Sequence, residues 1–365
     1  MTAMEHILLI TLLTVVSVLS VSAVAEEESI GHLALDPIDT VTTDAQGRFV
    51  VNDKLFFPVL LYSPKFDDDS LRMFAAHGFN ALSVTHRHIE LTQKLREMGL
   101  YSMVHAGRPI PEESLPGVLI AIGMDSPVLN WKDQWRDKLP AHTETIRANA
   151  PGRPIMSAIG YWGVEDLEAL RSNTILGEDD YEGLICELDV AAPYLYPVPY
   201  QSVASVADAV NRAREATGGT RPVLPVLQLF RWTADARYPT PAELHCMAHL
   251  ALIHGATGIG YYSFSTVIGE RDKTVADAAP ELWASVKPLN AEVHRVGLFL
   301  ISSKPDDAVR LKETPPGIHF RAARSGEKSM ILLTNAGDSV QTVHLVGSAE
   351  GQVTLQPLES RVIEQ

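Results

Sequence analysis

Short apolar runs recur along the chain and alternate with longer segments of helical periodicity. Each run has six to eight residues, which suits a buried parallel strand and is short for a helix. The runs predict strands at residues 57–62, 80–85, 101–106, 118–123, 155–160, 189–194, 223–230 and 257–264. Eight strands that alternate with helices close a (β/α)8 barrel, or TIM barrel, so we predict an α/β fold of this type.

One segment shows the strand-helix-strand unit of such a barrel most fully. After the strand at 223–230, Thr240-Pro-Ala-Glu243 places a capping threonine, a first-turn proline and a glutamate at the start of a helix. The helix is expected to run to His254 and to end at Gly255, before the next strand. Its spacing from Thr240 identifies Glu243 as a capping residue rather than a catalytic one.

Elements of a different kind flank the predicted barrel. Residues 40–61 alternate and contain the turn signals Asp44-Ala-Gln-Gly47 and Asn52-Asp53, so we expect an N-terminal β-hairpin that leads into the first barrel strand. Beyond the last predicted helix, 280–296, alternation and turns predict a small C-terminal antiparallel β-sandwich. The predicted domains are a signal peptide at 1–25, the N-terminal segment and hairpin at 26–56, the barrel at 57–299 and the sandwich at 300–365.

The N-terminus predicts export. An apolar run at 7–21 precedes Ala23-Val-Ala25, a small-x-small pattern typical of signal-peptidase sites. We therefore expect a periplasmic or extracellular protein with no stable membrane span after processing. A membrane anchor is the alternative, because the first six residues contain no Lys or Arg.

The composition restricts the class of molecule that the protein is expected to bind. The formal net charge of −15 argues against sequence-independent nucleic-acid binding, which needs clustered Lys and Arg. A neutral or sugar-like ligand fits better. No Gly-x-Gly-x-x-Gly turn follows an early strand, so we predict no dinucleotide and no other cofactor. Cys186 and Cys246 lie among apolar residues and are predicted to be buried free thiols, with a single disulfide as the alternative.

Aromatic side chains cluster at the predicted ends of the later strands, where barrel active sites lie. They are Tyr161, Trp162, Tyr194, Tyr196, Trp232, Tyr261 and Tyr262. Such rings stack on the C–H faces of sugars, so the predicted partner is an oligo- or polysaccharide, with Arg108 and Arg231 as hydrogen-bond donors. His86, His88 and His105 are predicted to bind hydroxyl groups; a transition-metal site made of these imidazoles is the alternative, which would indicate a metal-dependent hydrolase.

Several short motifs resemble the barrels of clan A glycoside hydrolases. They include the opening from Gly47 to Val59, His77-Gly-Phe-Asn-Ala, Tyr196-Pro-Val-Pro, Leu227-Gln-Leu-Phe and the stretch from His254 to Ser263. The resemblance implies a pair of catalytic carboxylates, one after strand four and one after strand seven. At these positions the chain has Ser126 and Gln228, and Tyr194 stands on strand six where an aspartate is common in such chains. Gln228, at the end of its strand, is predicted to bind the ligand.

Asp125 is the best remaining candidate for a general acid, because it follows strand four and precedes a proline. Glu270 in the loop after strand eight is the candidate partner, and Asp272 and Asp235 have a similar status. Asp189 begins a strand and is expected at the barrel bottom, where charges serve stability. The predicted function is hydrolysis of glycosidic bonds with non-standard catalytic residues. The alternative is a catalytically inactive barrel that binds carbohydrate.

Overall fold

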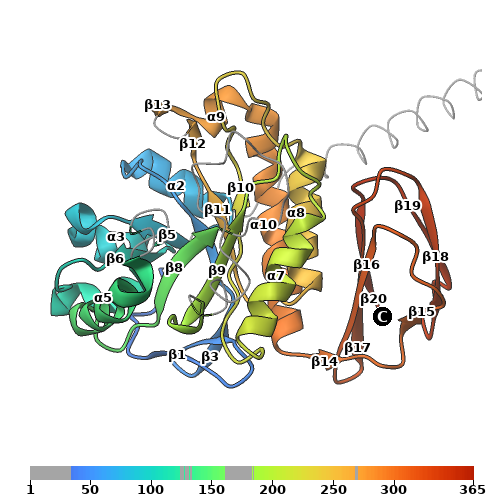
Figure 1. Ribbon diagram of the computed structural model, residues 1–365, viewed down its shortest axis with the longest axis horizontal. Coiled ribbons are helices and arrows are strands. Elements are labelled where there is room, and N and C mark those ends of the chain that lie inside the picture. The colour runs from blue at the N-terminus through green and yellow to red at the C-terminus, as the bar shows by residue number, and fades with distance from the viewer. Residues whose placement is uncertain are drawn as a thin grey trace, which may run out of the picture. The chain divides into compact units, whose positions relative to one another are not determined.

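A closed parallel barrel forms the centre of the molecule in the computed structural model, which describes residues 34–123, 127, 131, 134–160, 183, 185–267 and 270–365. Its strands follow the order β10-β11-β4-β5-β6-β7-β8-β9 (Figure 1). They are β4 (Val59–Leu61), β5 (Ala81–Val84), β6 (Tyr101–His105), β7 (Val118–Ile122), β8 (Ile155–Gly160), β9 (Val190–Leu195), β10 (Val226–Gln228) and β11 (Ile259–Tyr262). Each lies within or overlaps one predicted apolar run, and the predicted (β/α)8 fold is confirmed.

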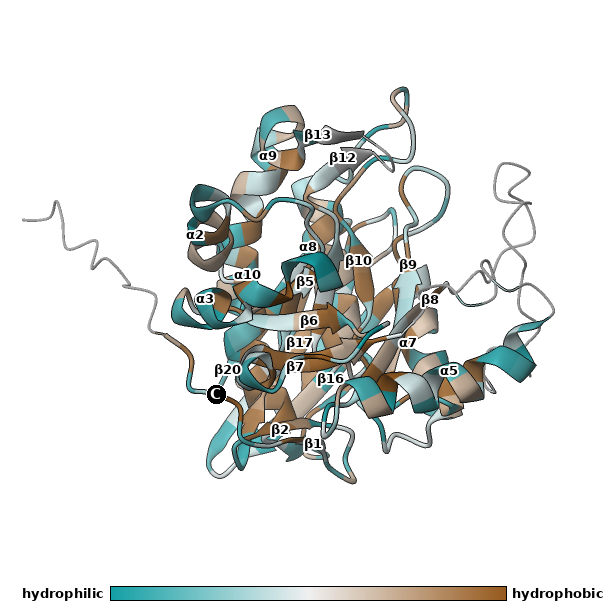
Figure 2. Ribbon diagram, turned by 90° about the vertical axis from the view of Figure 1, so that its left-hand side faces the viewer, coloured by the Kyte–Doolittle hydropathy of each residue, from teal (hydrophilic) through white to brown (hydrophobic). Residues whose placement is uncertain are grey.

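The barrel strands are buried on both faces, which explains why they read as continuous apolar runs. On β8, Met156 and Ala158 belong to the cluster inside the barrel, whereas Ile155 and Ile159 belong to the cluster between the strands and the helices. Figure 2 shows hydrophobic strands at the centre and hydrophilic positions on the outer helices.

Helices follow the strands and cover the barrel. They are α2 (Asp68–Ala76), η1 (His86–Leu91), α3 (Thr92–Glu97), η2 (Glu112–Gly117), α5 (Trp135–Asn149), α7 (Ser205–Ala216), α8 (Pro241–Ile253), α9 (Val275–Ala278) and α10 (Pro280–Ile301). Helix α8 ends as predicted, since His254 is its C-cap and Gly255 has a φ of +100°. Glycine adopts this left-handed backbone without a steric penalty.

A three-stranded antiparallel sheet closes the amino-terminal end of the barrel, and β1 and β3 lie there in Figure 1. It contains β1 (Val41–Thr43), β2 (Phe49–Val51) and β3 (Lys54–Phe56), one strand more than a hairpin. Both predicted turn signals are used, and Asn52 and Asp53 have φ values of 48° and 61°. Phe49 packs in the same cluster as the barrel interior, so this sheet seals that end with apolar side chains.

Two antiparallel sheets form the predicted C-terminal sandwich, with the orders β14-β16-β17-β20 and β15-β18-β19. Their strands are β14 (Lys304–Pro305), β15 (Arg310–Leu311), β16 (Ile318–Ser325), β17 (Lys328–Asn335), β18 (Gln341–Val346), β19 (Gln352–Leu355) and β20 (Ser360–Glu364). On β17, Ile331 and Leu333 face the sandwich core, whereas Met330 and Leu332 join the cluster of the barrel helices. The sandwich therefore uses one sheet to pack against the barrel, and Arg321 donates a hydrogen bond to the carbonyl of Leu252 at 2.7 Å.

Two local predictions were wrong. Cys186 is exposed rather than buried, because it lies at the surface just before β9; Cys246 is buried as predicted, and both thiols are free. Residues after β11 form a hairpin of β12 (Ser265–Val267) and β13 (Glu270–Thr274) instead of an irregular loop, because their backbones pair as antiparallel strands.

Within the described ranges, no helix has the length and apolar character needed to cross a membrane.

Candidate functional site

The inward-facing side chains at the carboxyl ends of the strands define the candidate site, because strand side chains alternate between the two faces. Tyr101 and Met103 belong to the interior cluster of β6, so His105 points to the same side. By the same alternation, Tyr194 near the end of β9 and Tyr262 at the end of β11 lie on the inside. These residues form the upper layer of the barrel interior.

Aromatic rings dominate this layer. We call them the aromatic cluster: Tyr62, Tyr194, Tyr196, Phe230, Trp232 and Tyr262. Tyr196 lies at its centre and stacks on Tyr194 with ring centroids 5.1 Å apart and on Tyr262 at 5.7 Å. Phe230 meets Tyr196 edge to face at 5.0 Å. These separations are typical of attractive aromatic pairs, so four neighbouring strands share one packed aromatic surface.

Two members of the aromatic cluster keep part of their surface open to solvent. Trp232 and Tyr262 are partly exposed, whereas Phe230 is fully buried and Tyr196 is 8% exposed. The indole N–H of Trp232 donates to the carbonyl of Tyr196 at 3.1 Å and fixes the orientation of the ring. The buried rings thus hold the exposed rings in place.

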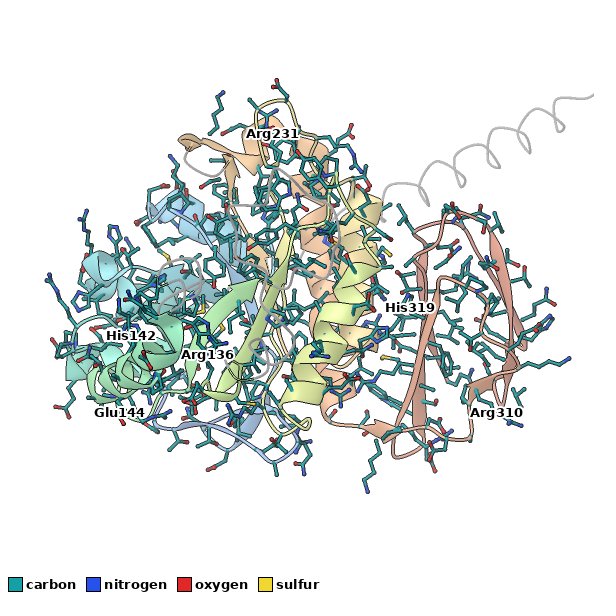
Figure 3. The ribbon with its side chains drawn as sticks, in the orientation of Figure 1. Arg136, His142, Glu144, Arg231, Arg310 and His319 are labelled. Atoms are coloured by element: carbon teal, nitrogen blue, oxygen red, sulfur yellow. The ribbon has the colours of Figure 1, made fainter. Side chains whose placement is uncertain are left out.

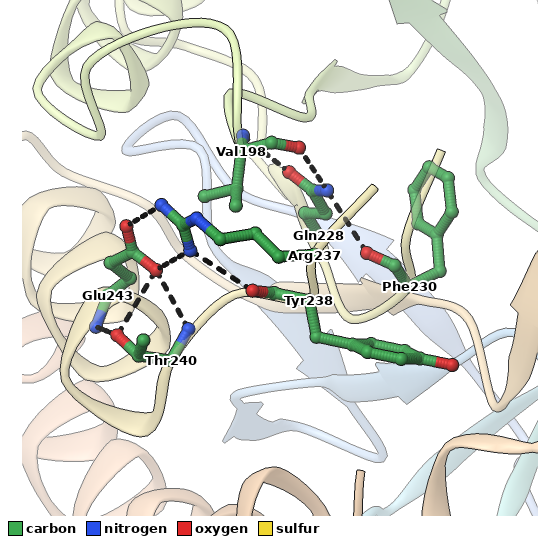
Figure 4. A network of polar contacts seen from close by, with 7 residues as sticks. All are labelled: Val198, Gln228, Phe230, Arg237, Tyr238, Thr240 and Glu243. Atoms are coloured by element: carbon green, nitrogen blue, oxygen red, sulfur yellow. Dashed lines mark hydrogen bonds and ion pairs between the residues drawn. The ribbon is translucent and has the colours of Figure 1, made fainter. Parts of the chain in front are cut away.

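Gln228 is buried at the end of β10, where the family resemblance implies a carboxylate. Its Oε1 accepts a hydrogen bond from Val198 N at 2.8 Å, and its Nε2 donates to the carbonyls of Val198 at 2.8 Å and Phe230 at 3.1 Å (Figure 4). The side chain therefore ties the loop after β9 to the loop after β10. Since every bond goes to backbone, Gln228 is a support of the site and not the ligand-binding residue that was predicted.

A second network in Figure 4 fixes the start of α8. Thr240 Oγ1 accepts from Glu243 N at 3.2 Å, and Glu243 Oε2 accepts from Thr240 N at 2.8 Å, which confirms the predicted capping box. Arg237 donates to both carboxylate oxygens of Glu243, at 2.7 and 2.6 Å. Burial alone would raise the pKa of Glu243, but the hydrogen bonds from Arg237 and Thr240 outweigh burial and hold the pKa below its usual value.

Removing this cap has a measurable consequence. Thr240→Ala is expected to lower the free energy of unfolding by about 1 kcal/mol, because an N-terminal N–H of α8 loses its acceptor. Urea unfolding at pH 7 measures the change. Thr240→Ser keeps the hydroxyl and should stay within a few tenths of a kcal/mol of the wild type; equal losses in the two variants would contradict the capping role.

The structure corrects the position of Tyr261. Its side chain is fully buried in the layer between strands and helices, where the ring meets Phe79 edge to face at 5.7 Å. Burial also raises the pKa of its hydroxyl. The alternation along β11 turns Tyr261 outward and Tyr262 inward, so Tyr262 is the residue of this pair that lies in the candidate site.

The three histidines do not gather into a metal site. His86 and His88 lie in η1, where the His88 ring packs on Phe66 at 4.5 Å, and His105 ends β6. In the described part of the chain, the only group of three metal-ligating side chains contains none of them. Among the described residues, the structure therefore does not form the metal site predicted from these imidazoles: His86 and His88 lie in η1, whereas His105 lies on β6.

The predicted arginines lie in the loops around the barrel mouth. Arg108 is exposed after β6, and Arg231 follows β10 at the same end of the molecule as α9 (Figure 3). Arg231 donates to the carbonyl of Ala234 at 2.8 Å, and its guanidinium lies 5.4 Å from the ring centre of Tyr238. Asp235 is exposed in the same loop. Arg231 is thus held at the rim by its own loop.

Carboxylates are absent from the eight barrel strands, all of which are described. Asp125, Ser126, Tyr161 and Trp162 fall outside the described residues, and of Glu270 only its backbone position on β13 is described. Asp189 lies at the barrel bottom as predicted, where it accepts a hydrogen bond from Ile155 N at 2.9 Å and pairs with Arg147. Any catalytic acid must therefore come from outside the barrel strands.

Sequence reasoning missed Tyr62 and Phe230, which complete the aromatic cluster. Both stand at the ends of predicted strands, and that position was the available signal. Tyr62 comes from the first strand, far along the chain from the other rings, and barrel closure beside β11 brings it to them.

No protein-family model matches this sequence, and no curated protein matches it. Among solved structures, the chain is similar to a β-galactosidase from Bacillus circulans sp. alkalophilus, with 8% identity over 86% of this chain and 99% of that one and a TM-score of 0.60. A catalytic mutant of a GH42 β-galactosidase from G. stearothermophilus gives 10% identity, coverage of 84% and 98%, and a TM-score of 0.55. The β-galactosidase from Rahnella sp. R3 has 10% identity over 84% of this chain and 98% of that one, with a TM-score of 0.53. The chain therefore shares the (β/α)8 barrel fold of these β-galactosidases.

Proposed function

We propose that this barrel binds a carbohydrate at the carboxyl ends of its strands. The observation that carries the proposal is the aromatic cluster, whose partly exposed rings Trp232 and Tyr262 rest on buried neighbours. Flat, rigid aromatic faces match the C–H faces of sugar rings and exclude water from the hydrogen bonds of the hydroxyl groups. We further propose that the protein is exported, which would bring it to extracellular or periplasmic polysaccharides.

Polar side chains around the cluster suit the hydroxyl groups of such a ligand. His105 ends β6 and is partly exposed, so its imidazole is available for hydroxyl groups from the opposite side of the barrel. Arg108 is exposed and adds a guanidinium donor. The net charge of −15 favours a neutral sugar over a polyanion.

Substitution of the exposed indole tests this proposal. Trp232→Ala is expected to weaken binding of the best polysaccharide ligand about tenfold, because one stacking face is lost. Affinity electrophoresis against a panel of plant and bacterial polysaccharides, followed by titration calorimetry, measures the change. Phe320→Ala, on the C-terminal sandwich, is the control and should bind like the wild type. Equal affinity of wild type and Trp232→Ala would contradict the proposed site.

Hydrolysis of glycosidic bonds is the second candidate function, and the fold similarity to β-galactosidases favours it. It would place Asp125 as the acid and Glu270 as its partner, both from loops or the hairpin beyond the strands. Turnover of aryl β-galactosides and other aryl glycosides tests it, with Asp125→Asn and Glu270→Gln as variants. Activity that survives both substitutions would exclude this pair, and binding without turnover would leave the carbohydrate-binding barrel.

A further inference from the structure

A group of metal-ligating side chains lies between α8 and α10, outside the candidate site. His245 and His249 are one turn apart on α8 and share a face of the helix. Glu292 projects from α10, and its Oε2 is 3.2 Å from His245 Nε2 while its Oε1 is 3.1 Å from His249 Nε2. The two imidazole rings stack with their centroids 4.5 Å apart.

The spacing of these atoms suits a small divalent cation. Ligand nitrogens and oxygens lie about 2.0–2.1 Å from zinc, so neighbouring ligands of a tetrahedral site are about 3.3 Å apart. The three donor atoms all lie within 4.8 Å of one another. Two neutral imidazoles and one carboxylate are also a ligand set that zinc commonly takes in proteins.

The buried imidazole supplies an independent observation. His249 is fully buried, and among the described residues neither of its ring nitrogens has a hydrogen bond of acceptable geometry. The contact of Nε2 with Glu292 is short, but the oxygen lies off the line along which the nitrogen bonds. An unsatisfied buried nitrogen costs free energy, and a metal ion placed between the three side chains would satisfy it.

We propose that His245, His249 and Glu292 bind one zinc-type divalent ion that links α8 to α10. The side chains of His245 and Glu292 are 31% and 28% exposed, which leaves one open position for a water ligand and a path for the ion. Arg295 lies one turn after Glu292 on α10, where it forms an ion pair with Glu364 and its charge also acts on His249. Because the group lies on the helices, the ion would stabilise the fold and take no part in carbohydrate chemistry.

Titration of the metal-free, untagged protein with Zn²⁺ tests this site. Calorimetry is expected to show one ion per chain, and Zn²⁺ is expected to raise the unfolding temperature. His245→Ala and Glu292→Gln should each weaken Zn²⁺ binding about 100-fold, since each substitution removes one of the side chains that bind the ion. Both side chains are partly exposed, so these variants should remain folded, which circular dichroism checks.

Two control variants replace histidines that lie in other parts of the chain. His319→Asn changes the His254–His319 imidazole pair, and His88→Asn changes an imidazole in η1 that packs on Phe66; both variants should bind Zn²⁺ like the wild type. Absence of bound Zn²⁺ in the wild type would overturn the proposal. So would binding that survives both His245→Ala and Glu292→Gln, or binding that is lost in His88→Asn.

Discussion

Gln228→Glu is expected to lower the free energy of unfolding by about 3–5 kcal/mol and to create no glycosidase activity. The substitution restores the residue type that the family resemblance implies for this position. It removes two N–H donors that now satisfy the carbonyls of Val198 and Phe230, and it places a carboxylate against those carbonyl oxygens. Gln228 is fully buried, so water cannot compensate for either loss.

Urea unfolding of wild type and variant, together with an aryl glycoside assay, measures this effect. The buried Glu should have a raised pKa, so the deficit in stability should be largest at neutral pH and should shrink as the carboxyl group takes up a proton. Gln352→Glu makes the same chemical change at an exposed position of β19 and should be nearly neutral. A Gln228→Glu variant with wild-type stability and new hydrolase activity would show that the position is catalytic.

Acidification from pH 7 to pH 4 is expected to cost about 2–3 kcal/mol of stability through His254 alone. His254 lies between the barrel and the sandwich, where its Nδ1 is 2.9 Å from Asn211 Oδ1 and its Nε2 is 2.8 Å from His319 Nδ1. Burial, together with the nearby charges of His319, Arg321 and Arg214, lowers the pKa of His254 from 6.5 to about 4. Above pH 6.5 both folded and unfolded states are neutral. Below it the unfolded state binds a proton first, so stability falls until the pH reaches about 4.

Urea unfolding at a series of pH values between 7 and 4 measures this dependence. Other partly buried histidines, including His77 and His294, also have lowered pKa values, so the informative quantity is the difference between variants. His254→Gln keeps an amide donor toward Asn211 but does not titrate, and its stability should fall less steeply with pH. His344→Gln, at an exposed position of β18, should follow the wild type. Identical slopes for His254→Gln and the wild type would contradict the assignment.

The barrel was predictable because each of its strands and helices is marked by residues that lie close together in the sequence. A strand buried on both faces must be apolar throughout, and the boundaries between such runs are marked by turn and capping residues such as Thr240 and Gly255. The same dependence on neighbouring residues limited what the sequence could predict about the site. In Tyr261-Tyr262 the sequence indicates two aromatic residues at a strand end, but a continuous apolar run does not show which of them faces inward.

Contacts between distant segments were outside the reach of pattern reasoning. Gln228 looked like a ligand-binding residue, because its partners Val198 and Phe230 are identified only when the loops after β9 and β10 are folded. His245 and Glu292 are separated by 47 positions, and only the packing of α8 against α10 brings them together.

The sequence by itself determined the (β/α)8 barrel, its flanking β-structures and the presence of aromatic residues at the strand ends. These follow from hydrophobic periodicity and helix capping, which depend on neighbours a few residues apart. The tertiary structure alone decided that Tyr62 joins Tyr262, that Tyr261 faces the helices, that Gln228 supports two loops and that His249 meets Glu292. The reason is physical: barrel closure and helix packing fix which face of each element is covered, and so which side chains meet across long separations in the chain.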